Sequence, residues 1–225
     1  MTSTFRPAKE VAKPRIANGL WLDHAIVSDE DIAWLNRVER LTLWNVKLPE
    51  GFLAKLPRLW WLDIRGGSAR DLLPIEGASS LKSLAVNQVR GLANLSALTS
   101  FTKLRSLSLY GLAKVTQLPS LGALMNLERA EIGQMKSLNA ITPVLDAPHL
   151  KELLLIRKLN VSQADADAIS KHSRLERFDW FAEDVPNKVW VPVVESVKLP
   201  KTRAMHPEEW FGLQSDAQLI NQADR

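Results

Sequence analysis

The chain has 225 residues, of which 46% are hydrophobic and 24% are charged, and its formal net charge is +4 at pH 7. These proportions are typical of a globular protein that buries a sizeable core, and they exclude a disordered chain. The absence of cysteine excludes thiol nucleophiles, iron–sulfur clusters and thiolate zinc sites, and it favours a reducing compartment, so we expect a cytoplasmic protein.

The N-terminal part should be a flexible segment followed by a cap. Residues 1–15 carry scattered positive charge with no apolar run behind it, so we expect no secretory signal there. Within residues 16–37, Leu20 and Leu22 alternate as in a short capping strand. Ser28 is followed by three acidic residues, which predicts the start of a helix because acids favour its first turn.

From residue 38 onward the pattern LxxLxL recurs at nearly constant spacing. Its seven copies are Val38, Leu41, Leu43; Leu59, Leu62, Ile64; Leu81, Leu84, Val86; Leu104, Leu107, Leu109; Leu127, Ala130, Ile132; Leu150, Leu153, Leu155; and Leu175, Phe178, Trp180. The fourth and sixth positions alternate with mostly polar ones, as in a strand with one buried face. Such a short strand cannot bury its apolar side alone, so the copies should stack into one curved parallel sheet.

The segments that return the chain between copies are also periodic. In the third to fifth copies apolar residues fall at every third position, as at Leu92, Leu95 and Leu98. This period suits 3₁₀ turns better than an α-helix. The sixth copy is the longest, and its residues 162–169 predict an α-helix. Asp165 and Asp167 lie two residues apart on that helix, so we expect a solvated face or a partner of the N-terminal helix dipole, and no catalytic carboxylate pair.

These repeats resemble the leucine-rich-repeat family, and most closely the class of about 22 residues found in bacterial internalins and in a regulatory subunit of a protein phosphatase. The resemblance covers residues 38–181 and implies an α/β solenoid of about seven short strands, with 3₁₀ turns or short helices on its convex side. The family often has asparagine three residues after the third apolar position. Here that column is Val46, Gly67, Val89, Leu112, Met135 and Lys158. These turns should therefore satisfy their backbone groups in another way.

The repeat pattern ends at Trp180, so residues 182–225 should form a C-terminal cap and tail. Prolines interrupt the valine-rich stretch from Val189 to Leu199, which predicts extended chain or an edge strand. No apolar stretch is long enough to span a membrane.

The sequence contains no pattern that predicts catalysis or a cofactor. The four histidines are not at metal-ligand spacing, and no nucleotide-binding glycine loop or serine elbow is present. Some bacterial leucine-rich-repeat proteins carry a ubiquitin-ligase domain with a cysteine nucleophile, which this chain lacks. We expect no catalytic residue, no metal and no cofactor.

The concave face, built by the third, fifth and seventh positions, is the expected binding surface. Its candidate partner-binding residues are Trp44, Trp60, Trp61, Arg65, Tyr110, Leu154, Ile156 and Phe181. Tryptophan, tyrosine and arginine are the residues that most often anchor interfaces. Two alternatives remain: the tryptophans could pack against the N-terminal extension, and the tail, with Trp190, Trp210 and Phe211, could cover the apolar cluster at the other end.

The sequence therefore predicts a cytoplasmic, bacterial-type module that binds another protein through its concave face and catalyses no reaction. We favour a monomer. A narrower hypothesis, by analogy, is that it neutralises a toxin or effector. The alternative class is a binder of nucleic acid or an anionic surface, driven by the positive charge. Lys and Arg are interleaved with Asp and Glu along the chain, whereas nucleic-acid binders concentrate them on one face, so we place this alternative second.

Overall fold

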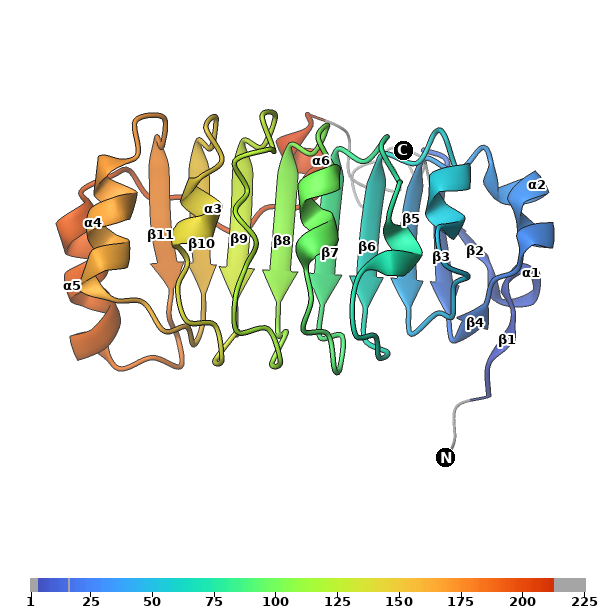
Figure 1. The fold of residues 1–225 in the computed structure, drawn as a ribbon, viewed down its shortest axis with the longest axis horizontal. Coiled ribbons are helices and arrows are strands. Elements are labelled where there is room, and N and C mark those ends of the chain that lie inside the picture. The colour runs from blue at the N-terminus through green and yellow to red at the C-terminus, as the bar shows by residue number, and fades with distance from the viewer. Residues whose placement is uncertain (1–3, 16, 213–225) are drawn as a thin grey trace, which may run out of the picture.

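The computed structural model describes residues 4–15 and 17–212, and its centre is one long nine-stranded sheet (Figure 1). Its parallel strands follow one another in chain order, and each pairs with the next residue for residue without a shift. They are β3 (Gly19–Asp23), β5 (Arg40–Trp44), β6 (Trp61–Arg65), β7 (Ser83–Asn87), β8 (Ser106–Tyr110), β9 (Arg129–Gly133), β10 (Glu152–Ile156) and β11 (Arg177–Phe181).

The predicted strands are confirmed at all seven copies of the repeat. Each copy places its fourth and sixth positions inside a five-residue strand, and their side chains point into the space between the sheet and the return segments. Every apolar position of the LxxLxL pattern is buried except Ile64, which is half-buried. The core is therefore one continuous column of stacked side chains.

A column of left-handed residues closes the turn after each strand. The residue that follows the seventh position has a φ between 49° and 69° in every turn from β3 to β10. These residues are His24, Asn45, Gly66, Gln88, Gly111, Gln134 and Arg157. Each donates its backbone N–H to the last carbonyl of the next strand, at 2.7 to 3.0 Å. This ladder of backbone bonds is how the turns are satisfied without the asparagine column.

The return segments cover the opposite side of the sheet with short helices (Figure 1). The first three carry 3₁₀ turns, at Phe52–Lys55, Leu73–Ile75 and Ser96–Ser100. The third copy has a 3₁₀ segment as expected, and beyond it the expected turns are isolated ones, such as those closed by Val115 N–H to Leu112 O at 3.2 Å and Leu138 N–H to Met135 O at 3.1 Å. The fourth copy has only turns, and the fifth has one α-helical turn, α3 (Thr142–Leu145).

The predicted helix of the sixth copy is α4 (Gln163–Lys171), capped by Ser162. Asp165 does not lie on a solvated face, since it is 2% exposed, but it lies in the first turn of the helix, where the other expectation places it. Its carboxylate accepts the Ser162 backbone N–H at 2.8 Å and the Ile141 N–H at 3.2 Å, which joins this helix to the preceding copy. The residue is a capping-box acid turned inward.

The N-terminal segment is built onto the solenoid, so the expectation of a flexible 1–15 is wrong for the described part. Strand β2 (Lys13–Arg15) pairs antiparallel with β3 and forms one edge of the sheet. Before it, β1 (Arg6–Pro7) pairs with β4 (Ala25–Ile26), and α1 (Ala8–Val11) buries Ala8 completely.

The rest of the N-terminal cap is as predicted. Leu20 and Leu22 lie in β3 and are buried against the first copy. Ser28 and Asp31 form a capping box at a 3₁₀ turn (Asp29–Asp31) that continues into α2 (Ile32–Leu35). Leu35 is fully buried, so this cap covers the apolar end of the solenoid.

The valine-rich stretch after β11 is a helix, not the extended chain that its prolines predicted. It is α5 (Asn187–Val197), which packs on α4 and β11. Val193 and Val197 are buried at helical spacing. Pro192 lies on the exposed side, where a carbonyl that loses its helical partner can bond to water. The chain then crosses behind the sheet to α6 (Pro207–Trp210) (Figure 1).

The first prediction concerns the stacked core. Leu107 lies in the middle strand β8 and is fully buried, so Leu107→Ala should lower the free energy of unfolding by about 2–5 kcal/mol, because neighbouring repeats cannot fill the cavity. Urea unfolding followed by tryptophan fluorescence measures the loss. Lys114→Ala, at an exposed turn, is the control. A loss no larger than that of the control would contradict the stacked core.

Candidate protein-binding face

The concave face predicted as the binding surface corresponds to the side of the sheet opposite the return segments. We call this side the sheet face. Residues 199–212, which we call the strap, cross this face from β11 towards β5 (Figure 1). The crossing begins where Pro200 O accepts the Phe178 N–H at 3.0 Å. Beside it, Lys201 O accepts a bond from the Arg177 guanidinium at 3.2 Å.

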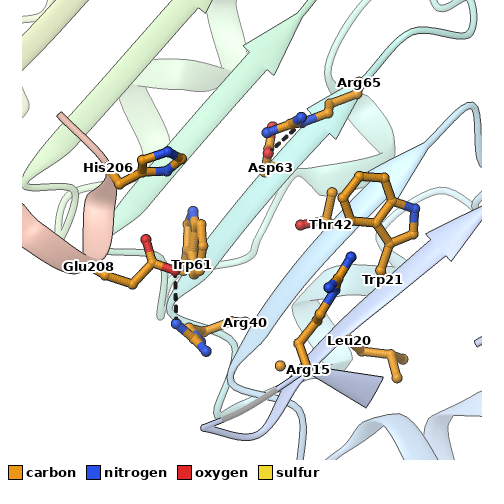
Figure 2. Close-up of a pocket in the computed structure, with 11 residues that line it drawn as sticks. Arg15, Leu20, Trp21, Arg40, Thr42, Trp61, Asp63, Arg65, His206 and Glu208 are labelled. Carbon is orange, nitrogen blue, oxygen red and sulfur yellow. Dashed lines mark hydrogen bonds and ion pairs between the residues drawn. The ribbon is translucent and has the colours of Figure 1, made fainter. Parts of the chain in front are cut away.

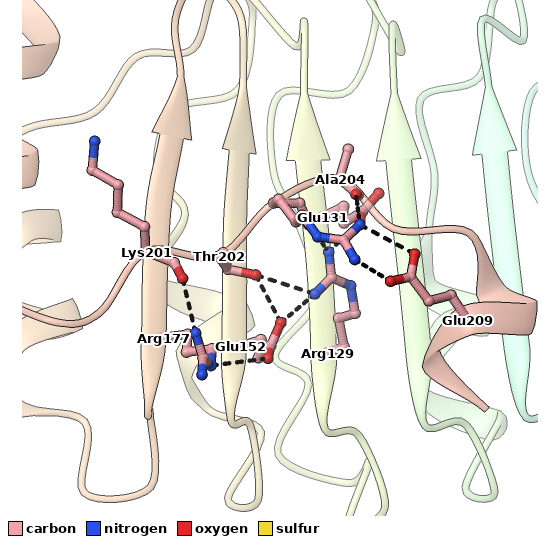
Figure 3. A network of polar contacts seen from close by, with 9 residues as sticks. Arg129, Glu131, Glu152, Arg177, Lys201, Thr202, Ala204 and Glu209 are labelled. Carbon is pink, nitrogen blue, oxygen red and sulfur yellow. Dashed lines mark hydrogen bonds and ion pairs between the residues drawn. The ribbon is translucent and has the colours of Figure 1, made fainter. Parts of the chain in front are cut away.

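A buried arginine of β9 holds the middle of the strap (Figure 3). Arg129 is 1% exposed and forms ion pairs with Glu131, at 2.6 Å, and with Glu152 of the neighbouring strand. It also donates to Thr202 Oγ1 at 3.2 Å and to Arg203 O at 2.5 Å. Thr202 in turn donates to Glu152 Oε2 at 2.7 Å. The network satisfies a guanidinium that the strap removes from water.

The far end of the strap is held by a second buried arginine. Arg40 Nη1 pairs with Glu208 Oε1 at 3.1 Å, and the two side chains are only 4% and 9% exposed. The Arg40 guanidinium lies 5.0 Å from the centre of the Trp61 ring. Next to it, Phe211 packs edge-on against Trp60, with ring centres 5.3 Å apart. The strap therefore covers the third-position row of the sheet face.

The strap changes the expected binding residues. Leu154 lies on β10 beside the Thr202 crossing and is 2% exposed, so it is not available to a partner. The hypothesis that the tail covers the C-terminal apolar cluster is correct for this residue but not for Phe181, which is 53% exposed. Trp60 and Trp61 are half-buried against strap residues and the arginine that the strap binds. It is thus the C-terminal segment, and not the N-terminal one, that covers these two tryptophans.

The seventh-position row remains open. It contains Trp44, Arg65, Asn87, Tyr110, Gly133, Ile156 and Phe181. Trp44 and Phe181, near its two ends, are 41% and 53% exposed. Trp44 and Arg65 are register partners on adjacent strands, as predicted. Gly133 has no side chain, and the side chains of its two neighbours in the row lie over its backbone. A Cβ there would lie 2.7 Å from Ile156 Cβ and 2.8 Å from Tyr110 Cδ2. Tyr110 and Ile156 therefore meet above this glycine.

At the N-terminal end the open row borders a hollow between β2, β3, β5 and β6 (Figure 2). Trp21 of β3 stacks on Trp44, with ring centres 5.9 Å apart and planes 22° apart. The Arg15 and Arg65 guanidiniums lie 5.2 and 5.7 Å from the Trp21 ring centre. Trp44 thus does contact the N-terminal cap, yet keeps an exposed surface.

Two buried carboxylates line this hollow, Asp63 and Glu208, and Glu208 is the one that pairs with Arg40. Asp63 is 4% exposed and accepts bonds from Arg65 Nε at 2.7 Å and from Asn87 Nδ2 at 3.2 Å. Burial raises the pKa of Asp63 above its usual value, although Arg65 opposes this shift. The cations of the hollow are more exposed, since Arg65 keeps 40% of its side-chain surface and Arg15 is exposed.

Sequence patterns predicted that part of the tail covers the last repeats, but they identified neither the path of the strap as far as β5 nor the hollow. The strap has no apolar period, and its charged residues bind strands far away in the chain. One signal was present: three of the seven third positions are arginine, at Arg40, Arg129 and Arg177, and the first two of them are buried under the strap, which is unusual for arginine. Acidic residues late in the chain could have been matched with them.

No further chemistry is visible in the described residues. Residues 4–15 and 17–212 contain no group of three His, Cys, Asp or Glu side chains that could hold a metal ion. Over the same residues, no helix has both the length and the apolar character needed to cross a membrane.

Comparison with known proteins found one matching family model and similar solved structures. Residues 72–135 match the family model described as R13L1/DRL21 LRRs, and the parallel sheet continues this repeat on both sides, so the expected leucine-rich-repeat fold is confirmed. The chain is also similar to the crystal structure of an internalin from Listeria monocytogenes, with 17% identity and a TM-score of 0.39, over 83% of this chain and 67% of that one. Among curated proteins, none has a significantly similar sequence.

The second prediction concerns the anchoring of the strap. Arg129→Gln should lower the free energy of unfolding by about 3–5 kcal/mol, because it leaves Glu131 and Glu152 without their buried cation. Denaturant unfolding monitored by tryptophan fluorescence gives the value. Arg203→Gln is the matched control, since Arg203 is paired with Glu209 but both are exposed, so stability should hardly change. Equal effects of the two variants would show that the buried network does not anchor the strap.

The third prediction concerns Gly133, where two side chains of the seventh-position row meet. Gly133→Ala should destabilise the protein by about 1–3 kcal/mol, because the added methyl group overlaps Ile156 and Tyr110. Thermal unfolding measures the effect, and the Tyr110 ring resonances should shift. Gly122→Ala is the control, since its Cβ would approach no atom closer than 3.5 Å. If Gly133→Ala behaved like this control, the two side chains would not be packed over the glycine.

Proposed function

We propose that this protein is a non-catalytic module that binds another protein along the seventh-position row of its sheet face. The observation that carries the proposal is the division of that face: the strap covers the third-position row, whereas the seventh-position row stays open with Trp44 and Phe181 exposed near its ends. Large exposed apolar side chains on a rigid surface are typical of protein interfaces.

The size and composition of the row support a protein partner. Six strand spacings separate Trp44 from Phe181, which is roughly 29 Å at about 4.8 Å per strand, enough for a standard interface. Aromatic and aliphatic residues predominate along it, with two polar residues, Arg65 and Asn87, next to each other near one end, and such a mixture is usual at protein interfaces. Leucine-rich-repeat domains in general serve as protein-binding scaffolds, which agrees with this assignment.

The rigidity of the row favours binding without rearrangement. Its side chains extend from strands that are hydrogen-bonded on both sides between β5 and β10, so little conformational freedom is lost when a partner docks. The narrower hypothesis, that the bound protein is a toxin or effector to be neutralised, stays a prediction. Binding of nucleic acid is the competing class, and it is disfavoured because the open row is largely uncharged beyond Arg65.

The fourth prediction tests the function. Trp44→Ala should weaken binding of the partner by at least roughly thirtyfold, because truncating an interface anchor removes 2 kcal/mol or more. The protein should stay folded, since the ring lies on the surface. Pull-down from the native host with the wild type, Trp44→Ala and the control Lys114→Ala identifies proteins that only Trp44→Ala loses. Titration calorimetry with the purified partner then gives the affinities.

The same measurement separates the two classes of partner. Trp61→Ala is not an equivalent test, because Trp61 also packs on the arginine that binds the strap. If Trp44→Ala bound the partner as tightly as the wild type, and raised salt abolished binding of both, the aromatic row would not be the interface. Charge-driven binding would then replace the proposal.

A further inference from the structure

We propose that the hollow formed by Arg15, Trp21 and Arg65 binds a carboxylate on an extended segment of the partner protein. This inference rests on the proposed function and names the chemistry that the N-terminal end of the open row recognises. The hollow lies where the strap ends, between β2 and β6, and Figure 2 shows the Arg15 side chain reaching into it beside Trp21.

The molecule already contains an internal example of this recognition. Arg40 stacks on Trp61 with 5.0 Å between the guanidinium carbon and the ring centre, and this pair receives the carboxylate of Glu208 at 3.1 Å. An indole face thus positions a guanidinium, and an acidic residue of a crossing segment binds to it. The strap therefore shows how an acid docks on this face.

The neighbouring cluster has the same components without the acid. Arg15 and Arg65 lie 5.2 and 5.7 Å from the ring centre of Trp21. Arg65 uses its Nε for Asp63, and its terminal nitrogens have no hydrogen-bond partner among residues 4–15 and 17–212. Within the same described residues, Arg15 forms no ion pair. Two guanidiniums held against one indole, with donors left over, are suited to a carboxylate.

The charge around the hollow favours an anion and limits its size. Asp63 and Glu208 are the acids that line it, but both are buried and already paired, with Arg65 and Arg40 respectively, so the exposed groups are cationic. Beyond Arg65 the open row continues with neutral side chains as far as Phe181. A polyanion such as nucleic acid would need positive charge along the whole row. One carboxylate followed by apolar residues fits the surface better.

The strand spacing predicts the sequence of such a segment. From β6 to β8 is two spacings, or about 10 Å, which a chain in the polyproline II conformation covers in about three residues at 3.1 Å each, and its period of three places every third side chain on the same side. An acidic residue over Arg65 would therefore be followed by an apolar one, three positions later, over Tyr110. A second apolar residue three positions further on would reach Ile156 on β10. The expected segment is acid, two polar residues, apolar, two polar residues, apolar.

A peptide titration tests this assignment. The probe is the synthetic sequence Glu-Ser-Thr-Leu-Ser-Thr-Phe with Gly-Ser at both ends, and its matched control has Gln in place of Glu. Binding is followed on the full chain by NMR through the indole signals of Trp21 and Trp44. We expect the Glu peptide to bind at least about tenfold more tightly than the Gln peptide, as for a charge-assisted hydrogen-bonded pair.

Variants then assign the carboxylate to the hollow. Arg15→Gln should remove most of the preference for Glu over Gln, and Arg15→Lys should restore part of it. Arg15 is an exposed edge-strand residue, so the fold should not change. Arg174→Gln, an equal change of charge at an exposed site of the last repeat, should keep the full preference. No saturable binding of the Glu peptide, or an unchanged preference in Arg15→Gln, overturns the proposal.

Two other occupants are distinguished by the same assay. The first is the chain's own C-terminal segment, since residues 213–225 contain Asp216 and Asp224. It would be the occupant if the double variant Asp216→Asn, Asp224→Asn bound the Glu peptide tenfold more tightly than the wild type. A short DNA duplex that displaced the peptide from wild type but not from Arg15→Gln would assign the site to phosphate. If Trp44→Ala weakens the partner complex but Arg15→Gln does not, the proposed function stands and the carboxylate site fails.

Discussion

A five-residue strand with apolar side chains on one side cannot exclude water by itself, and this constraint determines the rest of the structure. Each repeat buries its LxxLxL residues only by lying in register against the next one. The left-handed residue after each strand, such as Gln88 or Gly111, ties the turn to the next strand as well. Each pair of neighbouring repeats is thus joined in two ways, by packing of apolar side chains and by a backbone hydrogen bond from the turn.

The same constraint makes the ends of the stack a liability, because the first and last repeats have no neighbour to cover their apolar side. The N-terminal cap and α5 cover them from the two ends. The strap differs from these caps, because it covers no apolar end of the stack. It lies on the sheet face, where the repeats present mostly polar side chains. It holds there through Arg40 and Arg129, whose charges are matched by Glu208 and Glu152. What it leaves uncovered is the row on which the proposed function depends.

Periodic features could be predicted from the sequence, and single contacts could not. The strands, the capping strand at Leu20 and the helix of the sixth repeat each have a local pattern that agrees with their final environment. Helix α5 was missed because its valines fit both a period of two and a helical period, and burial against α4 decides between them. The covering of the last repeats by the tail was predicted, but the path of the strap as far as β5 was missed, because Glu208 and Arg40 are 168 residues apart. Among the candidate residues, Trp44 and Arg65 remain in the proposed interface, whereas Leu154 is buried.

The two anchors of the strap also limit the number of repeats that can lie between them. Arg129 and Arg40 are separated by four strand spacings, about 19 Å, and the six residue steps from Thr202 to Glu208 reach at most about 20 Å when extended. Because α6 begins at Pro207, the backbone covers less than this, and the Arg40 and Glu208 side chains bridge the rest. One more strand spacing would exceed the extended reach of this backbone. Repeat arrays readily gain or lose units by duplication, but an extra unit between these strands would pull one anchor off its arginine. In this protein the strap, which follows the last repeat, therefore restricts how many repeats can lie between β5 and β9.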